Sequence, residues 1–235
     1  MNYAGHHSMM RGSGSASLPY QPLAGIYSDG TAYCVLPHVH TNATTGKVEF
    51  SVVSVGSVIW SNLQSKNFCG CSTNDSKHLL NNYNTGIGYP YTTVDMQLYC
   101  GVGIMGNAMA YPIVNPLTFI GERNGSNMFL TIKDKDTGTV LINKSDTTSV
   151  QMTLGRLGIF TQNDAGAGSG IRPIVGRVPE NHAILSFKYW DGSDLIADLQ
   201  PCQEIATGEI CFFNLVDSSF VKNVAGSGSL SAYSQ

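Results

Sequence analysis

The sequence predicts an all-β fold, and three observations lead to that prediction. Charged residues make up only 12% of the chain while glycine occurs 26 times in 235 residues, a balance typical of short strands joined by tight turns. Several segments alternate between apolar and polar residues with the period of two that a half-buried strand requires. No window of comparable length shows the 3.6-residue period of an amphipathic helix.

The first clear strand signals lie in the middle of the chain. Residues 47–52 alternate, with two valines and a phenylalanine on one face and polar residues on the other, and are expected to form a strand. Residues 128–132 alternate in the same way, the turn-forming residues 134–138 follow, and the apolar residues 140–142 come after the turn. This arrangement predicts a β-hairpin.

Further strands are expected in the second half of the chain. They cover residues 150–154, 157–160, 183–190 and 210–216, the last being the final strong strand signal. Residues 163–170 have almost pure loop composition and are expected to form a surface connection. About a dozen short strands without a long helix predict a double-sheet architecture, a jelly-roll β-sandwich.

The C-terminal segment carries a family resemblance. Residues 184–188 read Ile-Leu-Ser-Phe-Lys, residues 195–202 read Leu-Ile-Ala-Asp-Leu-Gln-Pro-Cys, and residues 211–217 read Cys-Phe-Phe-Asn-Leu-Val-Asp. This succession resembles the final strands of concanavalin A-like (laminin-G-like) jelly-roll domains, in a branch common in phage and prophage virion proteins and in gut-bacterial surface proteins. The chain departs from that pattern at Ala197, where the family often has Arg, and at Asn214, where it often has Asp. The resemblance implies a surface-binding module rather than an enzyme.

The chain is expected to contain an arm and one domain. Residues 1–20 include the Gly/Ser-rich run 11–17, which has too little apolar surface to pack by itself, and are expected to form an extended N-terminal arm. Residues 21–235 are expected to form a single concanavalin A-like β-sandwich, because no charged or proline-rich linker divides them.

Charge and hydropathy exclude several classes of partner. The formal net charge of -3 leaves no basic stripe, so neither nucleic acid nor a membrane surface is an expected partner. Residues 1–11 lack the basic and apolar regions of a secretory signal, so we do not expect classical secretion. The six cysteines are therefore expected to be buried, reduced thiols, whereas an exported protein should carry a disulfide at Cys69 or Cys71.

No catalytic constellation is evident. Glycoside hydrolases on this fold commonly place closely spaced carboxylates on one strand in a Glu-x-Asp-x-x-Glu pattern, which does not occur here. The pairs Asp134/Asp136 and Asp191/Asp194 are better explained as turn formers. There is also no Gly-x-Ser-x-Gly elbow of the kind that serine hydrolases use. The sequence therefore predicts no enzyme and no catalytic residue.

Metal sites were weighed at three places. His38 and His40 would share one face of a strand, but a third zinc ligand is not evident nearby. Cys69 and Cys71 lack the usual two-residue spacing, and the Asp134 loop lacks the distal glutamate of a calcium loop. We therefore expect no metal and no other cofactor.

Carbohydrate binding is the ligand hypothesis that the residues favour. Flat aromatic faces suit the C–H surfaces of sugars, and neutral polar side chains suit their hydroxyls. The alternative for each aromatic residue is a place in the sandwich core or in a subunit interface. The candidate ligand-binding residues are Trp60, Asn82, Tyr83, Tyr89, Tyr91 and Trp190.

The functional hypothesis is a non-enzymatic virion surface protein, such as a head fibre, capsid decoration protein or tail-fibre component, located on the surface of particles assembled in the bacterial cytoplasm. Its arm would bind other virion proteins, and its jelly roll would bind host or environmental glycans. A homo-oligomer, with a trimer favoured, is expected. One alternative is a bacterial cell-surface lectin or adhesin, and another is a glycan-cleaving enzyme. The step from fold to glycan binding is an analogy.

Overall fold

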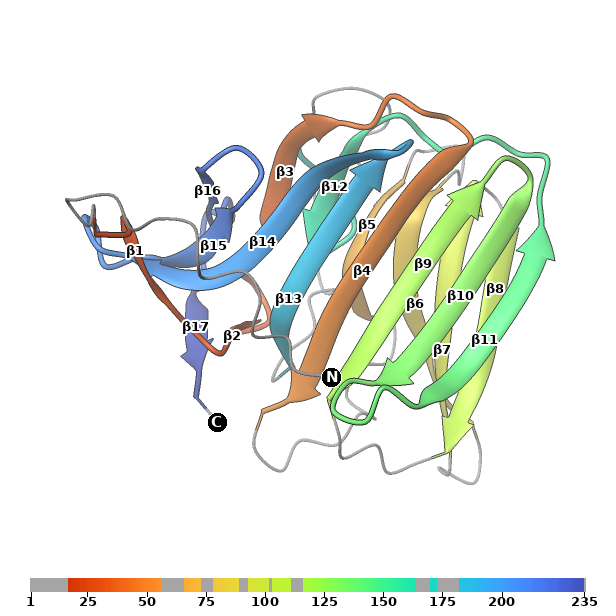
Figure 1. The fold of residues 1–235 in the computed structure, drawn as a ribbon, viewed down its shortest axis with the longest axis horizontal. Coiled ribbons are helices and arrows are strands. Elements are labelled where there is room, and N and C mark those ends of the chain that lie inside the picture. The colour runs from red at the N-terminus through yellow and green to blue at the C-terminus, as the bar shows by residue number, and fades with distance from the viewer. Residues whose placement is uncertain are drawn as a thin grey trace, which may run out of the picture.

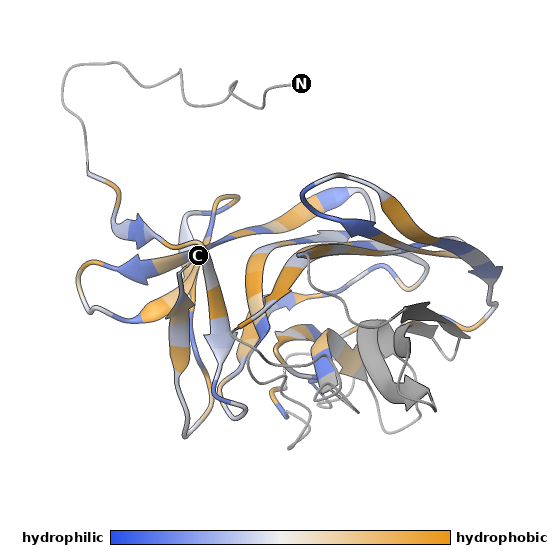
Figure 2. Cartoon of the chain, turned by 90° about the horizontal axis from the view of Figure 1, so that it is seen from below, coloured by the Kyte–Doolittle hydropathy of each residue, from blue (hydrophilic) through white to orange (hydrophobic). Residues whose placement is uncertain are grey.

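The structure of the chain is a computed structural model. The structure describes residues 17–55, 66–72, 78–88, 93–101, 103–110, 116–163, 170–172 and 182–234. These residues form seventeen strands in two sheets and no helix. The two sheets lie face to face, as the edge-on view of Figure 2 shows. The chain is therefore an all-β sandwich, as the sequence predicts.

The larger sheet forms the front layer in Figure 1. Its main path runs in the order β11, β10, β9, β4, β13, β14, β15 and β16, while β1 pairs with β14 and β2 pairs with both β13 and β17. Its strands are β1 (Tyr20–Pro22), β2 (Gly25–Ser28), β4 (Thr45–Ser54), β9 (Leu117–Asn124), β10 (Asn127–Asp134), β11 (Val140–Thr147), β13 (His182–Asp191), β14 (Asp194–Glu204), β15 (Ile210–Asn214), β16 (Ser219–Val221) and β17 (Leu230–Tyr233).

The smaller sheet lies behind it and runs in the order β3, β12, β5, β6, β7 and β8. All of its pairings are antiparallel. Its strands are β3 (Cys34–Val39), β5 (Lys66–Ser72), β6 (His78–Gly88), β7 (Thr93–Gly101), β8 (Gly103–Ala110) and β12 (Arg156–Ile159).

An aromatic cluster joins the two sheets. Phe50 of β4 is fully buried, and its ring centroid lies 5.0 Å from that of Phe119 and 6.1 Å from that of Phe187 on the neighbouring strands. Its third aromatic neighbour, Phe68, comes from β5 of the smaller sheet, with 5.6 Å between the ring centroids. Phe50 faces inward because the alternation of β4 places one residue in two on the buried face.

The sheets approach each other closely at Gly121. A Cβ atom at this position of β9 would lie 2.6 Å from Leu98 Cδ1, which belongs to β7 of the opposite sheet. Glycine is therefore needed here because the facing leucine takes the space that a side chain would fill.

Most of the expected strands are confirmed, and one is wrong. The strand at 47–52, the hairpin at 128–142 and the strands at 183–190 and 210–216 correspond to β4, β10–β11, β13 and β15. Residues 150–154 form no strand. The guanidinium of buried Arg123 donates hydrogen bonds to the carbonyl groups of Thr148 and Val150, and the N–H of Met152 donates to the carbonyl of Ala43, which lies outside the strands. The expected loop at 163–170 lies almost wholly outside the described residues.

The start of the domain is fixed by an aromatic contact. Tyr20 opens β1, is buried, and stacks on Phe213 of β15 with 4.4 Å between the ring centroids. Tyr20, the last residue of the expected arm, is therefore the point at which the chain joins the larger sheet. Residues 1–16 of the arm lie outside the described residues.

Replacing Phe50 with alanine is expected to lower the free energy of unfolding by about 3–5 kcal/mol, because it leaves a cavity between the sheets. Phe129→Ala is the matched control, since this ring on β10 is 38% exposed and its removal should change the free energy by no more than about 0.5 kcal/mol. Chemical denaturation measures both values. Equal losses at the two positions would contradict the assigned core.

Candidate functional site

The candidate site is built around Asp191, the last residue of β13. The chain reverses directly after it through Gly192, whose φ of +61° is easily adopted only by glycine, and continues into β14. The N–H of Gly192 donates to the carbonyl of Thr45, which fixes the turn against β4. The Asp-Gly pair thus ends the strand and places the carboxylate at one end of the sandwich.

The Asp191 carboxylate accepts hydrogen bonds from the end of β3 and from the segment that links β3 to β4. Its Oδ2 accepts from His38 Nε2 at 2.8 Å, from the N–H of Thr41 at 2.7 Å and from the Thr41 hydroxyl at 2.8 Å. Its Oδ1 accepts from the N–H of Asn42 at 3.0 Å and lies 3.2 Å from His40 Nδ1. Both imidazoles therefore converge on one carboxylate, which is their shared partner.

These contacts keep the buried Asp191 ionised. Only 7% of the residue is exposed, and burial by itself would raise the pKa of its carboxyl group. Hydrogen bonds from His38 and Thr41, together with the nearby His40 ring, outweigh this effect and lower the pKa to about 2. At neutral pH the residue is an anion whose oxygens are already occupied by donors.

The inner side of this network reaches the core. His40 is fully buried, and its Nδ1 lies 2.5 Å from the hydroxyl oxygen of Tyr189 on β13. Burial lowers the pKa of His40 more than the Asp191 charge raises it, so the ring is neutral at neutral pH. Burial and the Asp191 charge raise the pKa of Tyr189 well above 10, so the hydroxyl keeps its proton. These groups form a structural network closed to solvent.

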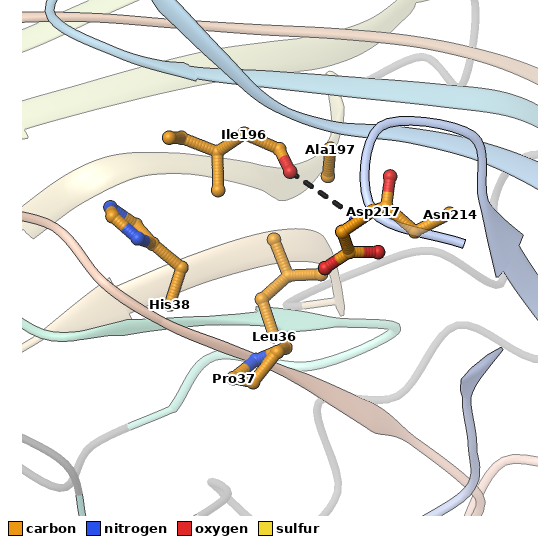
Figure 3. A pocket seen from close by; sticks show the side chains of 7 residues that line it. All are labelled: Leu36, Pro37, His38, Ile196, Ala197, Asn214 and Asp217. Carbon is orange, nitrogen blue, oxygen red and sulfur yellow. Dashed lines mark hydrogen bonds between the residues drawn. The ribbon is translucent and has the colours of Figure 1, made fainter. Parts of the chain in front are cut away.

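His38 faces outward and lines a cavity of about 310 Å³, which we call the His38 hollow. The hollow lies between β3, β14 and the turn that joins β15 to β16. Its volume is at the lower end of the range for small-molecule pockets, ~300–1,000 Å³. It is lined by Leu36, Pro37, His38, Ile196, Ala197, Asn214 and Asp217 (Figure 3).

The hollow combines an aliphatic surface with polar groups at two sides. Figure 3 shows the imidazole of His38 on one side and the carboxylate of Asp217 on the other, with Leu36 and Ile196 between them. Asn214 serves the local backbone: its Oδ1 accepts from the N–H groups of residues 198 and 216, and its Nδ2 donates to the carbonyl of Ile196. The polar groups that face the hollow are therefore mainly those of His38 and Asp217.

The Asp191 anion determines which ring nitrogen of a neutral His38 carries the proton. Because Asp191 Oδ2 accepts from Nε2, that nitrogen carries the ring proton, and a neutral His38 has its lone pair on Nδ1. The His38 side chain is 30% exposed. The hydrogen bond to Asp191 therefore fixes the orientation of the imidazole at the hollow. The lining residues of the hollow include no serine, threonine or cysteine that could act as a nucleophile beside this ring.

Trp190 is the one predicted ligand-binding residue whose side chain the structure describes, and it does not line this hollow. Trp190 lies on β13, half-buried, with the ammonium of Lys47 4.5 Å from its ring centroid. Asn82 and Tyr83 lie on β6, and of these two only the backbone is described. Trp60, Tyr89 and Tyr91 lie outside the described residues. Glycan binding by these six residues stays a prediction.

Sequence reasoning missed the residues that form the site. Asp191 was interpreted as a turn former, which it is, but its carboxylate also binds the 38–42 segment. The contacts of Asp191 with His38 and His40 join residues that are far apart in the sequence, so no local sequence pattern predicts them. Asn214 and Ala197 were noted only as departures from the family pattern, and Asp217 belongs to a turn whose position over β3 depends on the fold.

The described residues contain no group of three or more His, Cys, Asp or Glu side chains placed to hold a metal ion. At the Asp134 loop, which the sequence predicts to be a turn rather than a calcium site, Asp134 Oδ1 accepts hydrogen bonds from the N–H groups of Asp136 and Thr137. No described segment is a helix that is long and apolar enough to span a membrane. Buried cysteines among the described side chains are Cys34, Cys69, Cys71, Cys202 and Cys211.

Comparison with solved structures identifies the fold. A heptameric SAP-like pentraxin from Limulus polyphemus is similar over 72% of this chain and 76% of its own, with 11% identity and a TM-score of 0.50. The enzymatically active domain of tailspike protein 2 from bacteriophage CBA120 matches 74% of this chain at 11% identity, also with a TM-score of 0.50. The LG1–3 region of the laminin α2 chain matches 78% at 12% identity and the same TM-score.

These similarities define a concanavalin A-like jelly-roll fold of the laminin-G and pentraxin type, which confirms the predicted fold class. The aligned region spans 27% of the tailspike chain and 35% of the laminin chain. No protein-family model matches the sequence, and no curated protein matches it.

Replacing Asp191 with asparagine is expected to destabilise the protein by roughly 2 kcal/mol at neutral pH, because the depressed pKa reflects stabilisation of the anion in the folded state. A depressed folded-state pKa gives stability that is present above the unfolded value near 4 and is lost as the pH falls. The difference between wild type and Asp191→Asn should therefore shrink between about pH 4 and about pH 2.

Asp194→Asn is the matched control because Asp194 belongs to the same turn but is exposed. It should change the free energy of unfolding by no more than about 0.5 kcal/mol. Urea denaturation across this pH range measures both variants. A large effect of Asp191→Asn that does not vary with pH would contradict the role given to the anion.

Proposed function

We propose that the chain is a non-enzymatic glycan-binding module of a virion surface protein, and that the His38 hollow is its sugar site. The observation that carries the proposal is the composition of the hollow. Leu36 and Ile196 offer an aliphatic surface to the C–H groups of a sugar ring, while His38 and Asp217 stand at its two sides to bind hydroxyl groups. A volume of about 310 Å³ suits a small ligand such as one sugar unit of a longer glycan.

The carboxylates around the hollow support binding rather than cleavage. Glycosidases use two carboxyl groups across the scissile bond, one of them with a raised pKa. Asp217 is the single carboxylate among the lining residues. Asp191 is enclosed by donors and its pKa is lowered, the opposite of what a general acid requires. This arrangement favours a lectin-like role.

The virion role is supported by the family resemblance of the C-terminal strands and by the glycine- and serine-rich arm. We propose that the arm attaches the domain to other virion proteins and that the chain forms a homotrimer. Buried thiols fit assembly in a reducing cytoplasm. Disulfide mapping of the natural particle distinguishes this role from an exported lectin or adhesin, in which Cys69 or Cys71 would be paired.

Screening the protein against a glycan panel is expected to give binding without release of reducing ends. His38→Ala should weaken the binding of a retained glycan about tenfold, because the variant removes one of the two polar sides of the hollow. Trp190→Ala is the matched comparison, since Trp190 is also half-exposed on a strand but does not line the hollow. It should change the affinity less than about threefold. Isothermal titration calorimetry measures both.

Two results would overturn the proposal. Loss of binding on Trp190→Ala with full binding by His38→Ala would move the site to the outer face of the larger sheet. Hydrolysis that is lost on replacing one carboxylate would make the protein an enzyme.

A further inference from the structure

The polar groups that His38 and Asp217 present to the hollow are hydrogen-bond acceptors. The Nε2–H of His38 is donated to Asp191, so the neutral ring has only the Nδ1 lone pair to offer. Asp217 is an exposed carboxylate in the turn between β15 and β16. A ligand therefore has to bring donors to these two groups.

Asp217 is held in place by one of its two oxygens. Its Oδ1 accepts from the N–H of Ser219 at 3.0 Å and from the Ser219 hydroxyl at 2.6 Å. These bonds fix the side chain, while the other oxygen has no hydrogen-bond partner among the described residues, and Figure 3 shows the carboxylate beside the aliphatic part of the hollow. The charge is thus positioned by its turn and directed at the ligand space.

The net charge of the hollow is negative. Asp217 is its one ionised lining residue, and the remaining lining side chains are aliphatic, an amide and an imidazole. A negative site lined by acceptors attracts a cation that carries N–H groups and repels carboxylate, sulfate or phosphate groups. The ligand must also have an apolar face to cover Leu36 and Ile196.

We infer that the His38 hollow selects amino sugars and rejects acidic sugars, with the ammonium group of a 2-amino-2-deoxyhexose bound by Asp217 and the sugar ring lying on Leu36 and Ile196. This inference rests on the proposed glycan-binding function and names its substrate class. It requires no metal and no change in the fold. The Asp191 anion supports the selection indirectly, because it keeps His38 in the tautomer that accepts.

The test uses three β-(1→4)-linked tetramers of the gluco configuration: the glucosamine tetramer, the unsubstituted glucose tetramer and the glucuronate tetramer. Calorimetry with the full chain at neutral pH should show the glucosamine tetramer binding about tenfold more tightly than the glucose tetramer, and no binding of the glucuronate tetramer. Asp217→Asn should weaken binding of the glucosamine tetramer about fivefold to tenfold and leave that of the glucose tetramer within about twofold.

Two controls separate the local charge from other effects. Asp194→Asn removes an equal charge from an exposed turn outside the lining of the hollow and should leave the preference unchanged. Ser219→Ala removes a hydrogen bond that holds Asp217 but keeps its charge, so it should retain most of the preference. A loss that is equal in Asp217→Asn and Asp194→Asn would indicate unspecific attraction to the protein and would overturn the inference.

The inference and the proposed function fail in different ways. If the glucuronate tetramer binds best, or the glucosamine tetramer does not bind while another glycan does so in a His38-dependent manner, charge selection is wrong and glycan binding stands. If neither the tetramers nor a broad glycan panel bind, both are wrong.

Discussion

The hydrogen bonds accepted by the ionised carboxylate of Asp191 are the interaction on which this end of the sandwich depends. It lies at the end of β13 in the larger sheet, and it accepts hydrogen bonds from the segment that leaves β3 of the smaller sheet. The two sheets are thus tied at one end by a single charged group. An anion in such a buried position is stable only when several donors surround it, and His38, Thr41 and Asn42 provide them.

This constraint separates the roles of two carboxylates, those of Asp191 and Asp217. Both oxygens of Asp191 accept hydrogen bonds from the protein, and one of these bonds holds the imidazole of His38 at the wall of the hollow. Asp217 is exposed and is held by one oxygen only, so its charge is available to a ligand. A site in which Asp191 is fully hydrogen-bonded and Asp217 is available to a ligand is suited to binding, since the lowered pKa of Asp191 is the opposite of what a catalytic acid requires. The aliphatic surface between them supplies the apolar contact that a sugar ring needs.

The sequence predicts the scaffold well because strand alternation is a local signal. The inward positions of β4 and the hairpin of β10 and β11 follow from the period of two and from turn chemistry. Residues 150–154 alternate in the same way but form no strand: the remote side chain of Arg123 binds the carbonyl of Val150, and the N–H of Met152 donates to the carbonyl of Ala43. The site depends on the same kind of remote contact: Asp191 and His38 are 153 positions apart, and no local pattern joins them.

The central claim is that the His38 hollow binds the sugar. Backbone chemical-shift mapping tests it most directly, with the ¹⁵N-labelled protein titrated with the glycan it retains most tightly. The account predicts the largest shifts at Leu36, His38, Ile196 and Asp217, with little change around Trp190. Shifts that concentrate around Trp190 on the outer face of the larger sheet, with the lining residues of the hollow unmoved, would contradict it.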